Sequence, residues 1–485
     1  MTENTGKLPS GHRKTKKSVH RMAAEKALFP RWCYGGMIST KLEAIWEMSV
    51  KTRARVLPNN LDNNGWYHQL PPPPPARRLG SRESAHWAII GAGCCGLAVA
   101  RQLALHRPQD RIVLIDAERV GFGASGRNSG FMLNVHTHGM VKDQGVIRRN
   151  MRLWQGGLED LRRLVTEHQI QCDWSDWGRV YGAAGSEGES HMTEVAESYD
   201  RLELSYERLD QAGMERLTGT PFYTMGIRAH GSALVQPAAL MRGLAATLPA
   251  NVDLYEDCPV HEIHRGDGFK LVCAEGSVDA EKLILASGVF ITDLDYFRNR
   301  IVPVATYASL TRPLTATEKE TFREIDEFAL LPTSPNGSTI RWMHDGRLLI
   351  RNGLTYEADK NFEPGDLDMA RRIHREAIRR RWPQLAAIEF TDTWGGILAF
   401  TRNDGAIFGK LGEDAYGVVT SDISPVTRGS MAGKLLADYV VGADSDLLRL
   451  QLGIPKAGLL PPDPVLRFVV NHQFRKIRAR GAAEL

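Results

Sequence analysis

The sequence predicts a protein of mixed α/β (α+β) class, with a Rossmann-like domain and a second domain built on a mainly antiparallel sheet. Residues 86–116 (HWAIIGAGCCGLAVARQLALHRPQDRIVLID) read as strand, glycine loop, helix, strand and terminal acid. Residues 301–403 read as strands with one long helix. A chain of 485 residues is long enough to form two or more domains.

The glycine loop follows the spacing Gly91-x-Gly93-x-x-Gly96. The first glycine permits the tight turn, the second lets the backbone approach a pyrophosphate, and the third lets the helix pack against the strand. The helix N-terminus offers free N–H groups and a partial positive charge to phosphates. Asp116, twenty residues after Gly96, can accept hydrogen bonds from a ribose 2′-hydroxyl. The motif therefore predicts a dinucleotide and leaves NAD and FAD open.

Composition is that of an ordinary globular protein, with 42% hydrophobic residues, 24% charged residues and a net charge of +4. The sequence contains no run of 18 apolar residues, so it predicts no membrane span. The first residues lack the apolar segment of a signal peptide, which favours a cytoplasmic location. Basic residues concentrate at 11–21 and 475–480 without the interleaved aromatics of a nucleic-acid interface, so we interpret both as solvated tails.

The cysteines show neither metal-ligand spacing nor a C-x-x-C pair, which predicts no metal site and reduced thiols. Two of them, Cys94 and Cys95, stand inside the glycine loop, where we interpret them as small residues and not as a redox pair. The six are Cys33, Cys94, Cys95, Cys172, Cys258 and Cys273.

The segment before the glycine loop is polar and basic over its first twenty residues, which predicts disorder there. Residues 38–55 predict one helix. Five prolines at 71–75 favour a polyproline II spacer, with an SH3-type ligand as the alternative.

After Asp116, residues 121–130 contain four glycines and predict a loop wrapped against a ligand. Apolar residues spaced by steps of 4 and 3 predict an amphipathic helix over 147–165, and shorter helices follow near 191–201 and 208–217. A further helix is expected over 238–246, with Pro237 in its first turn.

Several short strands are expected downstream: 252–256, 260–263, 269–274, 282–288, and runs within 301–314, 338–344 and 346–353. Residues 366–381 predict an arginine-rich helix. Residues 415–442 predict strand, turn and helix, with a helix N-terminus that stabilises negative charge near 421–429.

Seven segments together resemble the FAD-dependent amine and amino-acid oxidoreductases of the D-amino-acid oxidase/glycine oxidase superfamily, in the branch of gamma-glutamylputrescine oxidoreductase-like proteins. They span roughly residues 66–442 and are WYHQLPPPPP, IIGAGCCGLAVARQLA, GFGASGRNSGF, LILASG, VPVATYASLTRPL, WGG at 394–396 and VTRGSMAGKLLAD at 426–438.

The resemblance implies FAD as the cofactor. The first glycine loop, Asp116 and a backbone contact from Val260 would hold the ADP half, and later segments the flavin half. The residues so implied are Gly91, Ala92, Gly93, Cys94, Cys95, Gly96, Asp116, Ala117, Gly123, Ala124, Ser125, Arg127, Asn128, Ser129, Gly130, Val260, Ala286, Ser287, Gly288, Pro425, Val426 and Thr427.

The resemblance also implies a division of the chain. It consists of an N-terminal extension (1–66, partly disordered), a discontinuous FAD-binding domain (67–140, 236–300 and 404–442), a substrate domain (141–235 and 301–403) and a C-terminal tail (443–485).

The implied reaction is oxidation of a primary or secondary amine, or an N-substituted amino acid, by hydride transfer to flavin N5. Imine hydrolysis follows, and dioxygen or another acceptor reoxidises the flavin. The partners expected are thus a small amine and an electron acceptor. Where the family carries a Gly-x-Gly pair before the last helix, this chain has Ile423 and Pro425. That departure keeps two alternatives: a flavin-dependent monooxygenase, and an FAD-binding protein without oxidase activity that acts as a partner or scaffold.

The family reaction requires no indispensable protein acid or base, so catalytic residues are candidates only. Trp394 either walls the substrate face of the flavin or packs in the core. Arg351 either clamps a carboxylate or is structural, and Arg402 is similar. Tyr307 either contacts substrate or packs within a strand. His136 and His138 follow the flavin loop and either titrate or link covalently to flavin, or are ordinary histidines.

Overall fold

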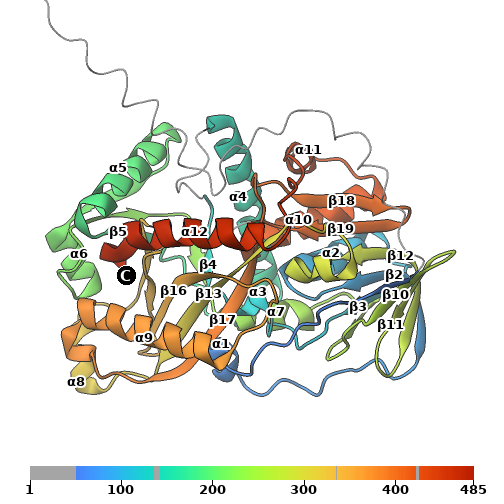
Figure 1. Cartoon of the computed structure of the whole chain (residues 1–485), viewed down its shortest axis with the longest axis horizontal. Helices are drawn as coiled ribbons and strands as arrows, with labels where there is room; N and C mark the ends of the chain where they lie inside the picture. Colours follow the sequence, from blue (N-terminus) through green and yellow to red (C-terminus); the bar gives the residue numbers. More distant parts are fainter. Residues whose placement is uncertain (1–50, 136–142, 335, 422–424) are drawn as a thin grey trace, which may run out of the picture.

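The computed structural model describes residues 51–135, 143–334, 336–421 and 425–485. Its strands form two large sheets that lie side by side (Figure 1), together with the small pair β4 (Phe131–Met132) and β8 (Ala233–Leu234). The larger sheets confirm the predicted combination of a Rossmann-like sheet with a mainly antiparallel one.

The first sheet has a parallel centre. β2 pairs with β3 on one side and with β12 on the other, so the strand order reverses at β2, the position at which α/β sheets bind nucleotides. Its strands in order are β1 (Lys51–Arg53), β10 (Glu262–Arg265), β11 (Phe269–Val272), β12 (Ser277–Leu285), β2 (Arg82–Ile90), β3 (Ile112–Ile115) and β9 (Val252–Tyr255), with β19 (Ala415–Val419) and then β18 (Ile407–Gly412) joining at β12.

Two apolar clusters cover the two faces of this sheet, as expected for strands buried on both sides. Ile89 of β2 faces one cluster and Ile90 the other. The first cluster includes residues of α2 and α10, which lie together beside the sheet in Figure 1. The helices on this side are α2 (Cys94–His106), α4 (Gln144–Glu167), α7 (Pro237–Ala246), α10 (Pro425–Val441) and α11 (Asp446–Leu452).

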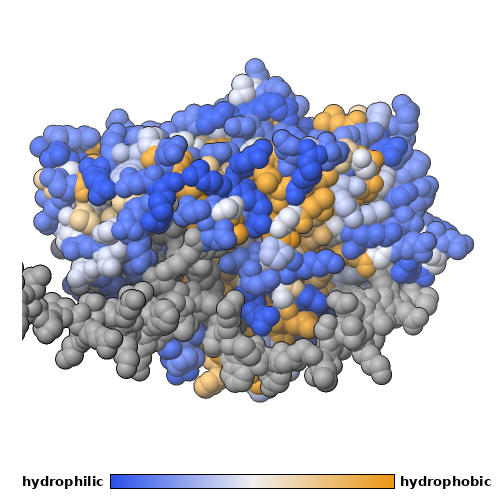
Figure 2. All heavy atoms as spheres, turned by 90° about the horizontal axis from the view of Figure 1, so that it is seen from above, coloured by the Kyte–Doolittle hydropathy of each residue, from blue (hydrophilic) through white to orange (hydrophobic). Residues whose placement is uncertain are grey.

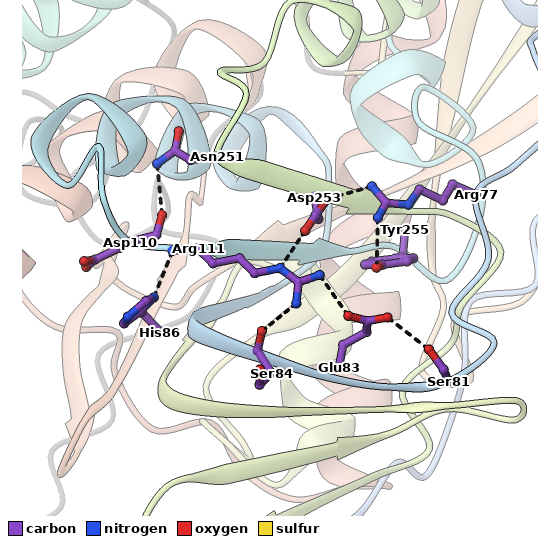
Figure 3. A network of polar contacts seen from close by, with 10 residues as sticks. All are labelled: Arg77, Ser81, Glu83, Ser84, His86, Asp110, Arg111, Asn251, Asp253 and Tyr255. Atoms are coloured by element: carbon purple, nitrogen blue, oxygen red, sulfur yellow. Dashed lines mark hydrogen bonds and ion pairs between the residues drawn. The ribbon is translucent and has the colours of Figure 1, made fainter.

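Charged side chains fasten the starts of these parallel strands (Figure 3). Arg111 donates to Asp253 at 2.8 Å and to Glu83 at 2.9 Å, and Arg77 donates to the other oxygen of Asp253 at 2.7 Å. Burial alone would raise the pKa of Asp253, but these hydrogen bonds from Arg111 and Arg77 hold it below its usual value. The network therefore ties the segment before β2 to the strands β2, β3 and β9.

The second sheet pairs antiparallel throughout except between β14 and β5. Helix α9 packs against one of its faces through Ala377 and Ile378. In order, its strands are β17 (Phe390–Phe400), β13 (Val302–Thr311), β16 (Leu348–Tyr356), β15 (Thr339–Trp342), β14 (Phe328–Pro332), β5 (Arg179–Ala183), β7 (Met225–Ala229) and β6 (Tyr206–Asp210).

The remaining helices lie around this second sheet and between the two sheets. They are α1 (Gly65–His68), α3 (Ala124–Arg127), α5 (Gly185–Arg201), α6 (Gln211–Thr218), α8 (Ala316–Lys319), α9 (Pro364–Arg381) and α12 (Val465–Arg480), with 3-10 turns η1 (Gly288–Leu294), η2 (Glu320–Phe322), η3 (Pro383–Leu385) and η4 (Gly481–Glu484).

Two expectations for the ends of the chain are wrong. Residues 51–53 of the predicted helix over 38–55 form strand β1, which completes hydrogen bonds at the edge of β10; residues 1–50 lie outside the described part. Residues 443–485, expected as a C-terminal tail, belong to the fold, because α12 buries Leu466, Val470 and Phe474 and lies over the second sheet in Figure 1, while the basic side chains of 475–480 are exposed. The carboxylate of Glu484 is buried and accepts a hydrogen bond from the Ser334 N–H at 2.6 Å.

The proline run does not stand free of the fold. Arg242 donates to the carbonyl of Pro71 at 2.9 Å and Arg119 to that of Pro74 at 2.6 Å. The face seen in Figure 2 is mainly hydrophilic, with apolar residues in separate patches. None of the described helices combines the length and apolar character that crossing a bilayer requires.

Candidate functional site

The first glycine loop joins β2 to α2 in a geometry that only glycine tolerates. Gly91 has φ +102°, and a Cβ there would lie 2.7 Å from the Ala286 carbonyl oxygen. A Cβ at Gly96 would lie well under 3.0 Å from the carbonyl oxygen of Gly91. Gly93, the N-cap of α2, has no side chain that could cap the helix, and the Cys94 N–H at the start of α2 donates to Ser125 Oγ at 3.0 Å.

Asp116 follows β3 and faces this loop. Its carboxylate accepts hydrogen bonds from the Ala92 N–H at 2.6 Å and the Glu118 N–H at 3.0 Å. Burial raises the pKa of Asp116 to about 7, and the two backbone hydrogen bonds oppose that rise. Ala117 is partly exposed beside it, whereas Val260 is buried in the connection before β10 and not in a strand as expected.

A second loop repeats the first. Residues 121–126 (GFGASG) have the same G-x-G-x-x-G spacing, Gly121 has φ +84°, and a Cβ at Gly126 would lie well under 3.0 Å from the Gly121 carbonyl oxygen. Both N-caps, Gly93 and Gly123, are extended, with ψ −174° and −170°. This repeated spacing is a signal in the sequence that distinguishes residues 121–126 from an ordinary glycine-rich loop.

The two loops touch each other. Ser125 Oγ accepts a hydrogen bond from the Cys94 N–H at 3.0 Å, which joins the start of α2 to α3. Positions for a Cβ at Gly123 and Gly288 meet no protein atom within 4 Å, in contrast to the crowded Gly96 and Gly126. The open glycines are the positions at which a ligand can approach the backbone.

Five consecutive carbonyl groups of the second loop each accept a hydrogen bond from a different residue. The Trp394 indole donates to the Arg127 carbonyl at 2.9 Å, and the Trp66 indole donates to the Asn128 carbonyl at 2.8 Å. The other three carbonyls, of Gly126, Ser129 and Gly130, accept from Asn64 Nδ2 at 3.2 Å, Arg341 Nη1 at 3.1 Å and the Val235 N–H at 2.9 Å. The loop is therefore held from three sides.

The polar side chains of this loop mainly serve the protein. The Arg127 guanidinium donates to the carbonyls of Phe122, Leu61 and Gly395, and burial lowers its pKa to about 10. Asn128 Nδ2 donates to the Ser125 carbonyl at 2.6 Å, and its Oδ1 accepts from the Gly130 N–H at 2.9 Å. Ala124 and Ser129 are partly exposed. Arg127 and Asn128 thus shape the loop, and a ligand would meet its backbone and Ser129.

Helix α10 packs tightly on α2 where both begin. A Cβ at Gly429 would lie 2.6 Å from Cys94 Sγ, and Cys94 and Cys95 are free, buried thiols. Pro425 occupies the first position of α10, where the missing N–H costs least. Val426 and Thr427 are buried, and the Thr427 hydroxyl approaches Met132 Sδ at 3.8 Å. Ile423 lies outside the described residues.

Ala286 and Ser287 follow β12 and lie next to the first glycine loop. Ala286 is buried and its N–H donates to the Ile90 carbonyl at 2.8 Å. Ser287 Oγ is a buried polar atom without a hydrogen-bond partner among the described residues. A buried hydroxyl without a partner beside the open Gly288 fits the phosphate or ribityl oxygens of a dinucleotide.

The substrate-domain candidates fall on opposite faces of the second sheet. Ala308 pairs with Trp394 on one side and Arg351 on the other, so the three share the face that meets the second glycine loop. Tyr307 lies on the opposite face, where its ring packs on Phe362 and its hydroxyl bonds Thr355 at 2.7 Å. Its placement therefore argues for the packed-strand interpretation.

Trp394 and Arg351 differ in what surrounds them. Trp394 is fully buried and holds the second loop through its indole N–H. Arg351 is partly exposed, forms no hydrogen bond or ion pair with any described residue, and burial lowers its pKa to about 10. On the same face, Thr306, Gly396 and Leu398 are also partly exposed. An unpaired guanidinium beside such a strip fits an anionic group.

The other candidates lie elsewhere. Arg402 is exposed in the turn after β17, and His136 and His138 fall outside the described residues. Among the residues whose positions the structure gives, no group of three His, Cys, Asp or Glu side chains could hold a metal ion.

Comparison with known proteins agrees with this geometry. Residues 86–439 match the family model described as FAD dependent oxidoreductase (DAO). The chain belongs to this family, as expected from the sequence, and it is an FAD-dependent oxidoreductase. The open glycines and the unpaired Ser287 hydroxyl are compatible with that cofactor.

Two relatives and one solved structure resemble this chain over about three quarters of its length. The chain is 25% identical over 381 residues to a probable oxidoreductase OrdL of Haemophilus influenzae, covering 75% of this chain and 85% of that protein. It is 25% identical over 363 residues to the gamma-glutamylputrescine oxidoreductase of Escherichia coli, covering 73% and 83%. The crystal structure of glycine oxidase from Geobacillus kaustophilus shares the fold, with a TM-score of 0.63, 18% identity, and coverage of 75% of this chain and 96% of that one.

Proposed function

We propose that this oxidoreductase acts on CH–NH or CH–NH2 groups, oxidising a primary or secondary amine or an N-substituted amino acid. When bound, FAD would supply the acceptor for the hydride of the amine-bearing carbon, the imine product would hydrolyse, and dioxygen or another acceptor would take up the electrons. Family membership supports the redox chemistry. Relatives named for gamma-glutamylputrescine and glycine support a nitrogen-bearing substrate.

Each of the two glycine loops would bind one half of the cofactor. The first loop and Asp116 would hold the ADP half: the positive N-terminal end of α2 would face the pyrophosphate, and the carboxylate would meet the ribose. The second loop, with Ser287 and Gly288, would hold the ribityl and flavin half. The anchored carbonyls of residues 126–130 fix the backbone of this loop before any ligand binds.

Arg351 is the observation that carries the substrate proposal. Arg351 is partly exposed, and a guanidinium that has lost part of its hydration without gaining a counter-ion is unfavourable. A substrate carboxylate would supply that partner as two parallel hydrogen bonds and orient the amine-bearing end. With a pKa near 10, Arg351 keeps its charge at neutral pH.

The proposal is tested by an anaerobic panel of amines and amino acids. Purified protein should be yellow, and substrates of the proposed class should bleach the flavin absorbance. Protein that takes up no FAD, or bound flavin that no nitrogen compound reduces, would refute it. The second result, joined to a stable complex with another protein, would favour the scaffold alternative; Pro425 gives that alternative no support, because the first position of α10 suits proline.

A further inference from the structure

A segment ahead of the nucleotide-binding fold reaches the second glycine loop. We call residues 60–68 the strap. Two of its buried side chains hold consecutive parts of the loop: Asn64 Nδ2 donates to the Gly126 carbonyl at 3.2 Å, and the Trp66 indole donates to the Asn128 carbonyl at 2.8 Å. Trp394 of β17 donates to the intervening Arg127 carbonyl, so the strap and β17 both hydrogen-bond to the backbone of residues 126–128.

The side chains of Arg127 in the loop and of Glu118 just before it also hydrogen-bond to the strap. Arg127 donates to the Leu61 carbonyl at 2.6 Å and to Asn63 Oδ1 at 3.1 Å. The main-chain and side-chain amides of Asn60 donate to both oxygens of Glu118, at 2.7 and 2.6 Å. These bonds run in both directions, so neither segment can shift alone without leaving buried polar groups unpaired.

The other side of the strap packs on the second sheet. A Cβ at Gly65 would lie 2.8 Å from the Trp394 ring and 3.0 Å from the Asp392 Cβ, so the backbone packs directly on β17. His68 Nδ1 lies 2.7 Å from an oxygen of Asp392, and Gln236 donates to the Trp66 carbonyl at 2.6 Å. The strap therefore fills the space between the second loop and the sheet that carries Arg351.

We propose that the strap is a positioning element of the flavin half of the cofactor site, a role that rests on the proposed function. Asn64 and Trp66 fix the height and tilt of residues 126–130 relative to β17, and so set how the flavin meets a substrate held at Arg351. They act through the loop and touch neither the cofactor nor the reacting atoms. The ADP half, held by residues 91–96 and 116, receives no hydrogen bond from Asn64 or Trp66.

The test compares FAD with ADP. Trp66→Phe keeps an aromatic ring but removes the indole N–H, leaving the Asn128 carbonyl unpaired. We expect the dissociation constant of FAD to rise about 5- to 100-fold, the range that an unpaired buried carbonyl costs. That of ADP should stay within about twofold. The absorption band of the remaining bound flavin should change shape, a change that a general loss of stability would not cause.

Trp342→Phe is the matched control. Trp342 is also buried, and its indole N–H also donates to a main-chain carbonyl, that of Ile325 at 2.8 Å, on the far side of the second sheet. It should cost comparable thermal stability while both dissociation constants stay at wild-type values. Asn64→Asp, which keeps the cap to the Trp66 N–H and loses the donor to Gly126, provides a second variant if Trp66→Phe fails to fold.

Equal weakening of FAD and ADP, or no weakening of either, in the strap variants would overturn the proposal. Failure of the proposed function is a separate result, because it would be seen in the wild-type protein as absent FAD uptake or as bound flavin that no amine reduces. Wild-type protein that binds FAD while its strap variants bind FAD equally well refutes the strap alone.

Discussion

Two alanine substitutions in the second glycine loop should separate folding from cofactor binding. At Gly126 a Cβ would lie well under 3.0 Å from the Gly121 carbonyl oxygen, a backbone atom that cannot swing away. Overpacking of this kind costs about 1–3 kcal/mol. At Gly123 a Cβ meets no protein atom within 4 Å, and the backbone at φ −78° and ψ −170° accepts alanine. Loss of the glycine cap there costs less than about 1 kcal/mol.

Gly126→Ala should therefore lower the stability of the apoprotein, whereas Gly123→Ala should mainly weaken FAD binding. Apoprotein carrying Gly126→Ala should melt about 1–3 degrees below wild type, whereas apoprotein carrying Gly123→Ala should melt within about one degree of it. Titration with FAD should show at least about tenfold weaker binding for Gly123→Ala, because its methyl group enters the space left for the ligand. Wild-type FAD affinity in Gly123→Ala would show that this glycine does not face the cofactor. An unchanged melting temperature in Gly126→Ala would refute the close-approach argument.

Three further predictions concern charged groups. Arg351→Gln should raise KM for a carboxylate-bearing substrate about 10- to 100-fold while leaving an amine without a carboxylate little affected, measured by steady-state kinetics on both; equal effects on both would contradict the clamp. Because burial raises the pKa of Asp116 to about 7, FAD affinity should increase as pH rises through 7, and apoprotein stability should fall between about pH 4 and 7; Asp116→Asn should flatten both profiles. Burial opposes protonation of His68, but hydrogen bonds to Asp392 and Asp62 raise its pKa, so its contribution to stability is complete below about pH 6.5 and is lost as pH rises through its folded-state pKa. Thermal melts of wild type and His68→Gln from pH 5 to 9 should converge at the alkaline end, and parallel curves would exclude this role.

The sequence predicts local features of the site well and long-range ones poorly. Gly91, Gly96 and Asp116 stand in a fixed spacing, because the constraint that selects them acts within one βαβ unit. Trp66 carries no such spacing. Its role depends on a hydrogen bond to Asn128, 62 positions away, which no periodicity encodes.

The faces of the second sheet show the same limit. Alternation within β13 separates Tyr307 from Ala308, but which face meets the glycine loop depends on the register with β16 and β17 and on an irregularity between Ala305 and Tyr307. Burial of α12 was likewise hidden, because its many arginines give the segment a polar composition although Leu466, Val470 and Phe474 are spaced for one buried face.

The order of strands in the first sheet bears on how the protein is made. β19 joins β12 and α10 covers α2, yet both come more than 300 residues after the first glycine loop in the chain. A ribosome that has released residues 82–115 has therefore exposed a nucleotide loop whose neighbouring helix lacks its cover. Because non-local pairings form late, the nascent chain must wait for nearly its whole length to emerge before it can load its cofactor. Truncation before residue 415, which removes both β19 and α10, should consequently produce colourless, aggregation-prone protein even though both glycine loops are intact.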